Sequence, residues 1–232
     1  MIDDSPIREE KSYISEVSDK TLYSKTFFWM FLGLLGTAVT AWYTYSSNIM
    51  ENLIMSGGYW GVVIAELVVV ILFSFCFRKL SPGMVTVLFF LYSMINGLSL
   101  STIFIAFDLG TIFKAFLATS LIFGVLAFVG KKTEIDISKW GNILFAMLVA
   151  GLILTIINLF IGSTGFEIML NWIMLAVFFG LIIYDMATIR ALKESGEFEE
   201  DKIAIYCAMQ LYLDFINIFI YLVQLFGNND SK

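Results

Sequence analysis

Long runs of hydrophobic residues dominate this chain, and short polar connections separate them. Each run is about 20 residues long, the length that an α-helix needs to cross a bilayer. Transmembrane β-strands are about half as long and alternate in polarity, which these runs do not. The pattern therefore predicts an all-α membrane protein, a seven-transmembrane-helix bundle, with spans at residues 26–45, 58–77, 84–107, 111–129, 140–162, 169–189 and 203–226.

The polar ends of the chain divide it into three expected parts. Residues 1–25 are polar and mildly acidic and lack the pattern of a secretory signal, so we expect a cytoplasmic N-terminal segment and a retained first span. Residues 26–227 form the seven-helix domain, and residues 228–232 form a short C-terminal tail. No stretch between the spans is long enough to bury a core of its own, so any function is expected inside the bundle.

Composition agrees with this class of protein. Hydrophobic residues make up 59% of the chain and charged residues 15%, with a mean hydropathy of +0.86. The net charge of −6 collects largely in the N-terminal segment and the sixth connection. No basic face suited to nucleic acid is present, so we expect none as a partner.

The basic residues predict the orientation of the bundle. Of the 14 lysines and arginines, all but Lys114 and Lys232 lie in the N-terminal segment or in every second connection after it. The positive-inside rule then places the N-terminus in the cytoplasm and the C-terminus outside. With no targeting signal recognised, we expect a prokaryotic inner (plasma) membrane protein.

Two aspartates interrupt the last two hydrophobic runs. Asp185 lies in Leu-Ile-Ile-Tyr-Asp-Met-Ala, and Asp214 lies in Leu-Tyr-Leu-Asp-Phe-Ile-Asn. An ionised carboxylate loses most of its hydration in such surroundings, which is costly. A helical hairpin that turns within the acidic stretch 194–202 would bring both aspartates to a similar depth. We expect a carboxyl pair that shares one proton and titrates as a unit.

The chain contains no histidine, which excludes the usual zinc sites and the Ser-His and Cys-His catalytic arrangements. It also removes the common sensor of pH near neutrality, so a pH response would have to come from carboxyl groups. Cys76 and Cys207 lie near predicted cytoplasmic helix ends, a reducing environment, and are interpreted as packing residues. We expect neither an enzyme nor a bound cofactor.

Two further polar residues complete a set of oxygen ligands within the spans. Glu66 is the third carboxylate inside a hydrophobic run and is interpreted either as an external cation station or as a packing residue. Asn217 follows Asp214 by three residues and so lies on nearly the same helical face. Calcium prefers several oxygen ligands, and Asp185 and Asp214 would be its main ones, enough for weak passage but not for a tight cage. Calcium is therefore expected as a transported ion.

Three segments carry motifs of a known family. They are Ala-Met-Gln-Leu-Tyr-Leu-Asp-Phe-Ile-Asn-Ile-Phe at 208–219, Gly-Leu-Ile-Ile-Tyr-Asp-Met-Ala-Thr-Ile at 180–189, and Arg-Lys-Leu-Ser-Pro at 78–82 leading to Asn-Gly-Leu-Ser at 96–99. In these segments the chain resembles the transmembrane Bax inhibitor motif family, also called the Bax inhibitor family. The resemblance covers nearly the whole chain.

The resemblance implies a bundle with a central last helix, whose cytoplasmic end is closed by paired aspartates. Asp185 and Asp214 match that pair, Arg78 or alternatively Lys79 matches a basic residue that can hydrogen-bond to it, and Glu66 matches an acidic residue of the second helix. The implied function is a pH-sensitive calcium leak channel, gated by protonation of the pair between the sixth and seventh helices. The sixth connection is longer and more acidic than the family pattern.

Two other functions stay open at this point. One is a nonenzymatic membrane regulator that acts by binding other membrane proteins, and the other is a proton-coupled cation exchanger. An intramembrane aspartyl protease is disfavoured because Asp214 follows Tyr-Leu and lacks a Gly-x-Gly-Asp context. Retinal binding is disfavoured because residues 203–226 contain no lysine. Besides calcium ions and protons, the expected partners are membrane lipids and other membrane proteins.

Overall fold

The computed structural model describes the backbone of residues 5–133 and 137–230, and the side chains of residues 19–133 and 139–227. Every regular element in these ranges is helical, and seven helices are long and apolar enough to cross a membrane. The all-α, seven-span prediction is thereby confirmed. The elements are α1 (Ser5–Ser46), α2 (Ile49–Met55), α3 (Tyr59–Cys76), the 3-10 turn η1 (Phe77–Lys79), α4 (Pro82–Ala106), α5 (Leu109–Lys132), α6 (Ile137–Ile161), α7 (Thr164–Ser195) and α8 (Glu200–Asp230).

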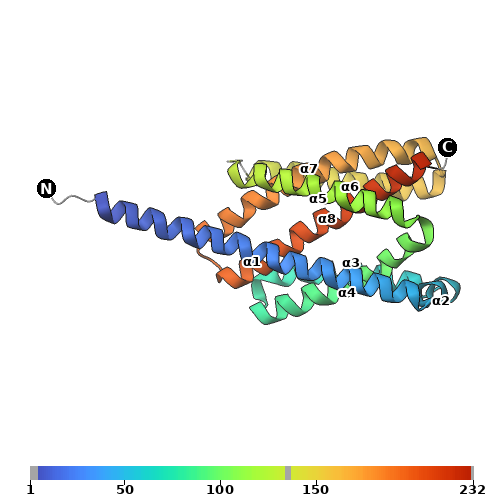
Figure 1. Ribbon diagram of the computed structural model, residues 1–232, viewed down its shortest axis with the longest axis horizontal. Coiled ribbons are helices and arrows are strands. Elements are labelled where there is room, and N and C mark those ends of the chain that lie inside the picture. The colour runs from blue at the N-terminus through green and yellow to red at the C-terminus, as the bar shows by residue number, and fades with distance from the viewer. Residues whose placement is uncertain (1–4, 134–136, 231–232) are drawn as a thin grey trace.

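Two features of the N-terminal third were not predicted. The polar segment before the first span is not separate from it, because α1 begins at Ser5 and projects beyond the rest of the bundle (Figure 1). The short helix α2 follows between α1 and α3. Hydrophobicity marks where a helix crosses the membrane, whereas backbone hydrogen bonds continue for as long as no residue breaks them.

Local capping residues define several helix ends. Ser81 caps α4, where its Oγ accepts a hydrogen bond from the Met84 amide at 3.4 Å and proline occupies the first helical position. Asp108 caps α5 and accepts from the Thr111 amide at 3.0 Å and from the Thr111 hydroxyl at 2.6 Å. The hydroxyl and then the amide of Thr111 hold the pKa of Asp108 below its usual range. At the end of α7, Gly196 takes a left-handed conformation with φ of 62°.

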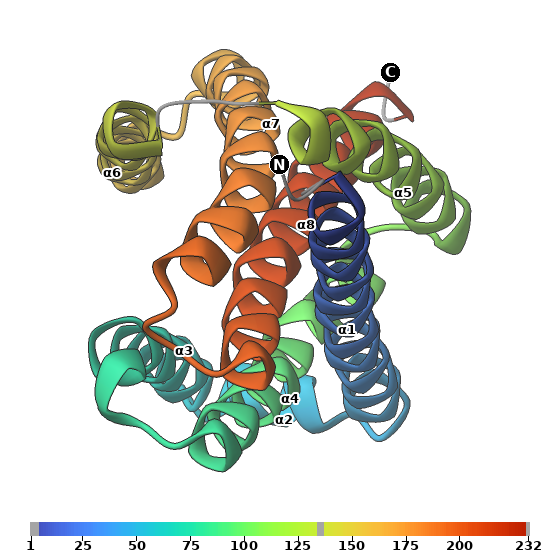
Figure 2. The same cartoon turned by 90° about the vertical axis from the view of Figure 1, so that its left-hand side faces the viewer.

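The last helix lies at the centre of the bundle (Figure 2). α8 packs against α1, α4, α5 and α7, while α3 packs mainly on α4, and α6 packs on α7 at the periphery. α8 is also the most buried of the seven spans. The central position implied by the family resemblance is therefore confirmed.

Small residues allow two helix pairs to approach closely. At Gly97 on α4, an added Cβ would lie 2.7 Å from the backbone oxygen of Thr37 on α1. At Gly130 on α5, an added Cβ would lie 2.9 Å from the Cα of Ile183 and 2.8 Å from the Cβ of Met186, both on α7. Such contacts are the usual way in which membrane helices pack.

The outer surface of the bundle is apolar along its spans. Phe75, Leu159 and Phe160 are 82%, 75% and 88% exposed, and many other large hydrophobic side chains lie beside them on the surface. In water such a surface would drive association, whereas lipid tails match its polarity. The protein is an integral membrane protein.

Candidate functional site

The aspartates of the last two hydrophobic runs come together where α7 and α8 run antiparallel. Residues 196–199 connect the two helices, so the turn lies inside the predicted acidic stretch. Asp185 lies 10 residues before the end of α7 and Asp214 lies 14 residues after the start of α8, so the antiparallel hairpin brings them to within about one helical turn in depth. Both side chains are buried, with 7% and 3% of their surface exposed.

The carboxyl groups of Asp185 and Asp214 interact directly with each other. Asp214 Oδ2 is buried and finds no hydrogen-bond partner among the described residues. A buried polar atom without a partner costs about 1–3 kcal/mol, and more when it is charged. The protein alone therefore does not satisfy this pair, and a proton or a cation would complete it.

The aspartate pair lies in the wall of a cavity of about 890 Å³. Residues of α3, α6, α7 and α8 form most of this wall, and Glu66 and Asn217 belong to it together with Asp185 and Asp214. The structure thus brings the four oxygen-bearing residues singled out in the sequence to one cavity. Its other uncharged polar lining residues, apart from tyrosines, are Ser74, Asn142, Thr155 and Gln210.

The acidic residues of the cavity do not form one compact cluster. In the part of the chain that the structure describes, no three His, Cys, Asp or Glu side chains lie close enough together to hold a metal ion. Tight calcium sites use about six to eight oxygen ligands. The oxygen-bearing side chains of the cavity wall come instead from different helices, with Glu66 on α3, Asp185 on α7 and Asp214 on α8.

Glu66 is held in place by a chain of hydrogen bonds that crosses the bundle. Asn96 Nδ2 donates to Glu66 Oε1 at 3.2 Å, and the Tyr212 hydroxyl donates to Asn96 Oδ1 at 2.9 Å. Thr37 Oγ1 lies 2.6 Å from the Tyr212 hydroxyl. These residues come from α3, α4, α8 and α1, so the network ties the wall of the cavity to the far side of the central helix.

Replacing Tyr212 by phenylalanine should destabilise the protein by about 1–2 kcal/mol, because Asn96 and Thr37 each lose a buried partner while the ring stays in place. The ring itself makes edge-to-face contacts with Phe89 at 5.7 Å and with Tyr92 at 6.0 Å, which phenylalanine retains. Thermal unfolding of purified protein in detergent measures the change. Tyr43→Phe, at an exposed position of α1, is the matched control; equal midpoints for the two variants would contradict a structural role of the network.

Asn217 lies on the same face of α8 as Asp214. Its Nδ2 donates to the backbone oxygen of Leu213, one turn earlier, at 2.7 Å. This bond fixes the amide nitrogen to the helix itself and leaves the amide oxygen as the group that can accept from, or coordinate, an occupant of the cavity.

The structure places Arg78 away from the aspartate pair. Its guanidinium forms an ion pair with Glu197 at 3.1 Å and lies 5.9 Å above the ring of Phe198. Asp185 is ten residues before the end of α7, a distance of roughly 15 Å along the helix axis. The predicted hydrogen bond between Arg78 and the aspartates is therefore not formed in this conformation, because η1 lies at the level of the α7–α8 connection.

A buried lysine that the sequence did not single out lies at the same end of the bundle. Lys202 is 7% exposed, donates to the backbone oxygen of Arg78 at 3.2 Å, and lies 4.9 Å and 5.1 Å above the rings of Phe77 and Phe198. Two ion pairs join α1 to the same region, Lys25 with Asp201 and Lys193 with Asp19, each at 2.5 Å. Ion pairs and cation–π contacts therefore join α1, η1, α7 and α8 at this end of the bundle.

The residues missed in the sequence share one property. Tyr212, Thr37 and Lys202 are ordinary residues for their positions in a helix, and their roles depend on partners more than 50 residues away along the chain. The role of Tyr212 could have been predicted from one feature of the sequence, its polar hydroxyl in an apolar helix two residues before Asp214.

Cys76 and Cys207 are free thiols, and Cys207 is buried in the core. Their interpretation as packing residues agrees with these positions.

A central helix that packs against four other spans and carries half of a buried carboxyl pair defines a polytopic membrane protein with an intramembrane polar cavity. Residues 19–231 match the family described as "Inhibitor of apoptosis-promoting Bax1". The chain therefore belongs to the Bax inhibitor family, as its motifs predicted.

Bacterial membrane proteins are among its relatives. The chain is 35% identical over 215 residues to the inner membrane protein YbhL of Escherichia coli (strain K12), covering 90% of this chain and 92% of that protein. It is 37% identical over 173 residues to a membrane protein of Streptococcus pyogenes serotype M1, covering 74% and 75% of the two chains. It is also 31% identical over 210 residues to a protein of Borreliella burgdorferi, covering 88% and 90%. These relatives carry no enzyme names.

Proposed function

We propose that this protein is a pH-sensitive calcium leak channel, gated by protonation of Asp185 and Asp214. The observation that carries the proposal is the position of this carboxyl pair, buried between two antiparallel helices in the wall of a polar cavity of about 890 Å³. Intramembrane ionisable residues typically mark ion or proton pathways, because their burial is otherwise costly.

The chemistry of the pair supports a latch. Two ionised carboxylates side by side in a water-poor site repel each other, whereas one shared proton removes the repulsion and links the two groups. With that proton bound, α7 and α8 are held together at this level. When the proton leaves, the helices separate and the cavity widens into a pathway, a local charge change acting on a two-state element.

Calcium fits the oxygen ligands that the cavity provides. Glu66 provides one carboxylate of the cavity wall, and the aspartates with Asn217 provide the other oxygen ligands. A calcium ion can replace the shared proton, since both neutralise the carboxylates. No compact cluster of three carboxylates is found in the described residues, which favours the passage of calcium over its tight binding.

The relatives and the basic residues support a location and an orientation. The name of the Escherichia coli relative describes an inner membrane protein, and the same compartment is proposed for this chain. The positive-inside rule orients the N-terminus and the α7–α8 connection toward the cytoplasm and the C-terminus outward.

One alternative is a nonenzymatic regulator that binds other membrane proteins, which the family description favours because it names an inhibitor of a protein. Another is a proton-coupled cation exchanger, which the same carboxyl pair favours if a proton and a cation occupy it in turn. An exchanger moves calcium against its gradient when a pH gradient is imposed, whereas a leak does not.

Calcium influx into liposomes that contain only this protein is the test. The flux should exceed that of protein-free liposomes and should change several-fold between about pH 5 and pH 8, where a histidine-free chain must respond through its carboxyl groups. A calcium dye inside the liposomes reports the flux. No flux above protein-free liposomes at any pH, together with capture of specific membrane proteins, would replace the channel by the regulator.

A further inference from the structure

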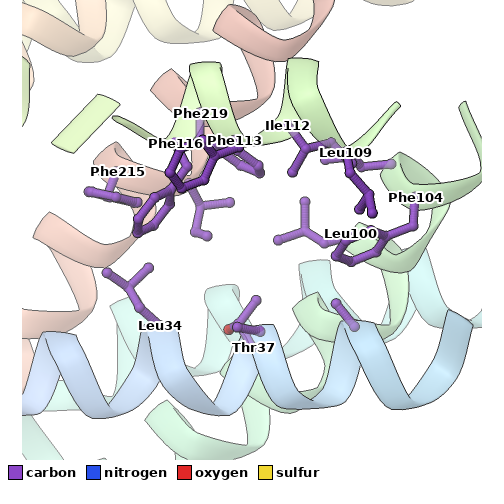
Figure 3. Close-up of a pocket in the computed structure, with 14 residues that line it drawn as sticks. Leu34, Thr37, Leu100, Phe104, Leu109, Ile112, Phe113, Phe116, Phe215 and Phe219 are labelled. Atoms are coloured by element: carbon purple, nitrogen blue, oxygen red, sulfur yellow. The ribbon is translucent and has the colours of Figure 1, made fainter. Parts of the chain in front are cut away.

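A second cavity lies between α1, α4, α5 and α8 and is separate from the polar one. Its volume is about 430 Å³. Figure 3 shows Leu34 and Thr37 on one side of the open space and side chains such as Ile112, Phe113 and Phe116 on the other. Phe215 and Phe219 of α8 also line it.

The two cavities lie on opposite faces of the central helix. Asp214 and Asn217 of α8 line the polar cavity, whereas Phe215, Ile216 and Phe219 line the second one. At about 100° of rotation per residue, these two sets point in roughly opposite directions. α8 therefore separates a polar space from an apolar one.

The second cavity offers almost nothing to a polar occupant. Of its lining side chains, only Thr37 carries a polar atom, and that hydroxyl already lies within hydrogen-bond distance of the Tyr212 hydroxyl and of the backbone oxygens of Gly33 and Ser93. A buried water needs about 2–4 polar partners, and apolar cavities of this kind stay dry and accept apolar ligands. The occupant must be hydrocarbon.

The cavity opens on the lipid-facing surface of the bundle. α1 and α5 both pack on α8, and their printed side-chain contacts with each other, Phe27 with Phe123 and Lys131 with Tyr23, involve no residue that lines this cavity. The residues at this gap are exposed: Leu109 by 62% and Phe113 by 61%, with Ala38 on the facing helix also exposed. The opening is therefore continuous with the apolar surface that lipid tails cover.

The size of the cavity selects among apolar occupants. A volume of 430 Å³ corresponds to a cube with edges of about 7.5 Å, whereas a helix with its side chains is about 10–12 Å across. A transmembrane helix of a second copy does not fit, but a flexible single hydrocarbon chain does.

We propose that the cavity lined by Leu34, Ala38, Leu109, Phe113 and Phe215 is a binding site for one acyl chain of a membrane lipid, which enters between α1 and α5. The site does not depend on the proposed calcium flux, because it lies across α8 from the carboxyl pair. The bound acyl chain fills the space that α1 and α5 leave between them at this level.

Photochemical labelling of the protein in lipid nanodiscs tests this site. The probe is a phosphatidylethanolamine with a diazirine on one acyl chain, and labelled residues are mapped by mass spectrometry of peptides. In the wild type we expect labels concentrated on the cavity-lining residues of α1, α5 and α8. In Ala38→Phe the new side chain fills the entrance, and labelling of the lining residues of α8 should fall at least several-fold.

Val39→Phe is the matched control, because Val39 is the next residue of α1, is 61% exposed and lines neither cavity. A second pair of variants provides an independent test in case Ala38→Phe misfolds. Leu109→Trp changes a residue that lines the cavity, and its control is Leu121→Trp on the same helix, where the side chain of Leu121 is 71% exposed. Selective loss of α8 labelling in the two cavity variants supports the acyl-chain site. Labels spread evenly over the surface, or equal labelling in cavity and control variants, would overturn it.

Discussion

Asp185→Asn and Asp214→Asn should each flatten the pH dependence of calcium flux in liposomes. On the flank of a titration, the protonated fraction of a group changes by up to about tenfold for each pH unit. A channel gated by one shared proton should therefore change its flux steeply over a narrow range of pH. An asparagine is never ionised, so either variant lacks the second carboxyl group, and the ratio of fluxes at high and low pH should fall close to one.

The measurement compares each variant with the wild type in the same liposome preparation, across the same series of pH values. Asp108→Asn is the matched control: it makes the same chemical change at the N-cap of α5, outside the cavity, and asparagine is an equally good cap. Because the pKa of Asp108 is below its usual range, that residue stays ionised throughout, and its loss should leave the pH profile unchanged. Profiles that stay steep in both cavity variants would reject the latch.

Gly130→Ala should destabilise the bundle by about 1–3 kcal/mol, the usual cost of overpacking a well-packed interior. The new Cβ would lie 2.9 Å from the backbone Cα of Ile183, which cannot move alone, and 2.8 Å from the Cβ of Met186. Relief therefore requires that α5 and α7 separate. Since these two residues flank Asp185 on α7, the same displacement should also shift the carboxyl pair. A larger residue such as leucine should prevent correct assembly.

Gly124→Ala is the control on the same helix, because an added Cβ at Gly124 meets nothing within 4 Å. There the substitution should be neutral or slightly stabilising, since alanine favours a helix more than glycine does. Thermal unfolding in detergent compares the two variants with the wild type. If both alanine variants unfold at the wild-type midpoint, the close approach of α5 to α7 at Gly130 does not limit packing.

Much of the fold follows from local properties of the chain. The cost of leaving a backbone polar group unpaired in lipid forces every hydrophobic run of sufficient length into a helix, so the number of spans can be counted from the sequence. The meeting of Asp185 and Asp214 could be anticipated for a similar reason. They lie at similar distances, 10 and 14 residues, from the helix ends that one turn connects, and a hairpin has only one simple way to fold back.

Features that depend on several helices at once could not be predicted from the sequence. The ion pair between Arg78 and Glu197 replaced the expected contact with the aspartates because it depends on where η1 meets the α7–α8 connection. The link from Glu66 through Asn96 and Tyr212 to Thr37 joins four helices, and no spacing along one helix reveals it.

The sequence by itself determined the class of protein, its seven spans, its family and the pair of intramembrane aspartates, because each is expressed in the hydrophobicity or the motifs of a continuous segment. Only the tertiary structure decided what surrounds those aspartates. It placed a polar cavity on one face of α8 and an apolar cavity on the other. The physical reason is that a cavity is the space that packed helices leave between them, and it depends on their side chains and crossing positions together.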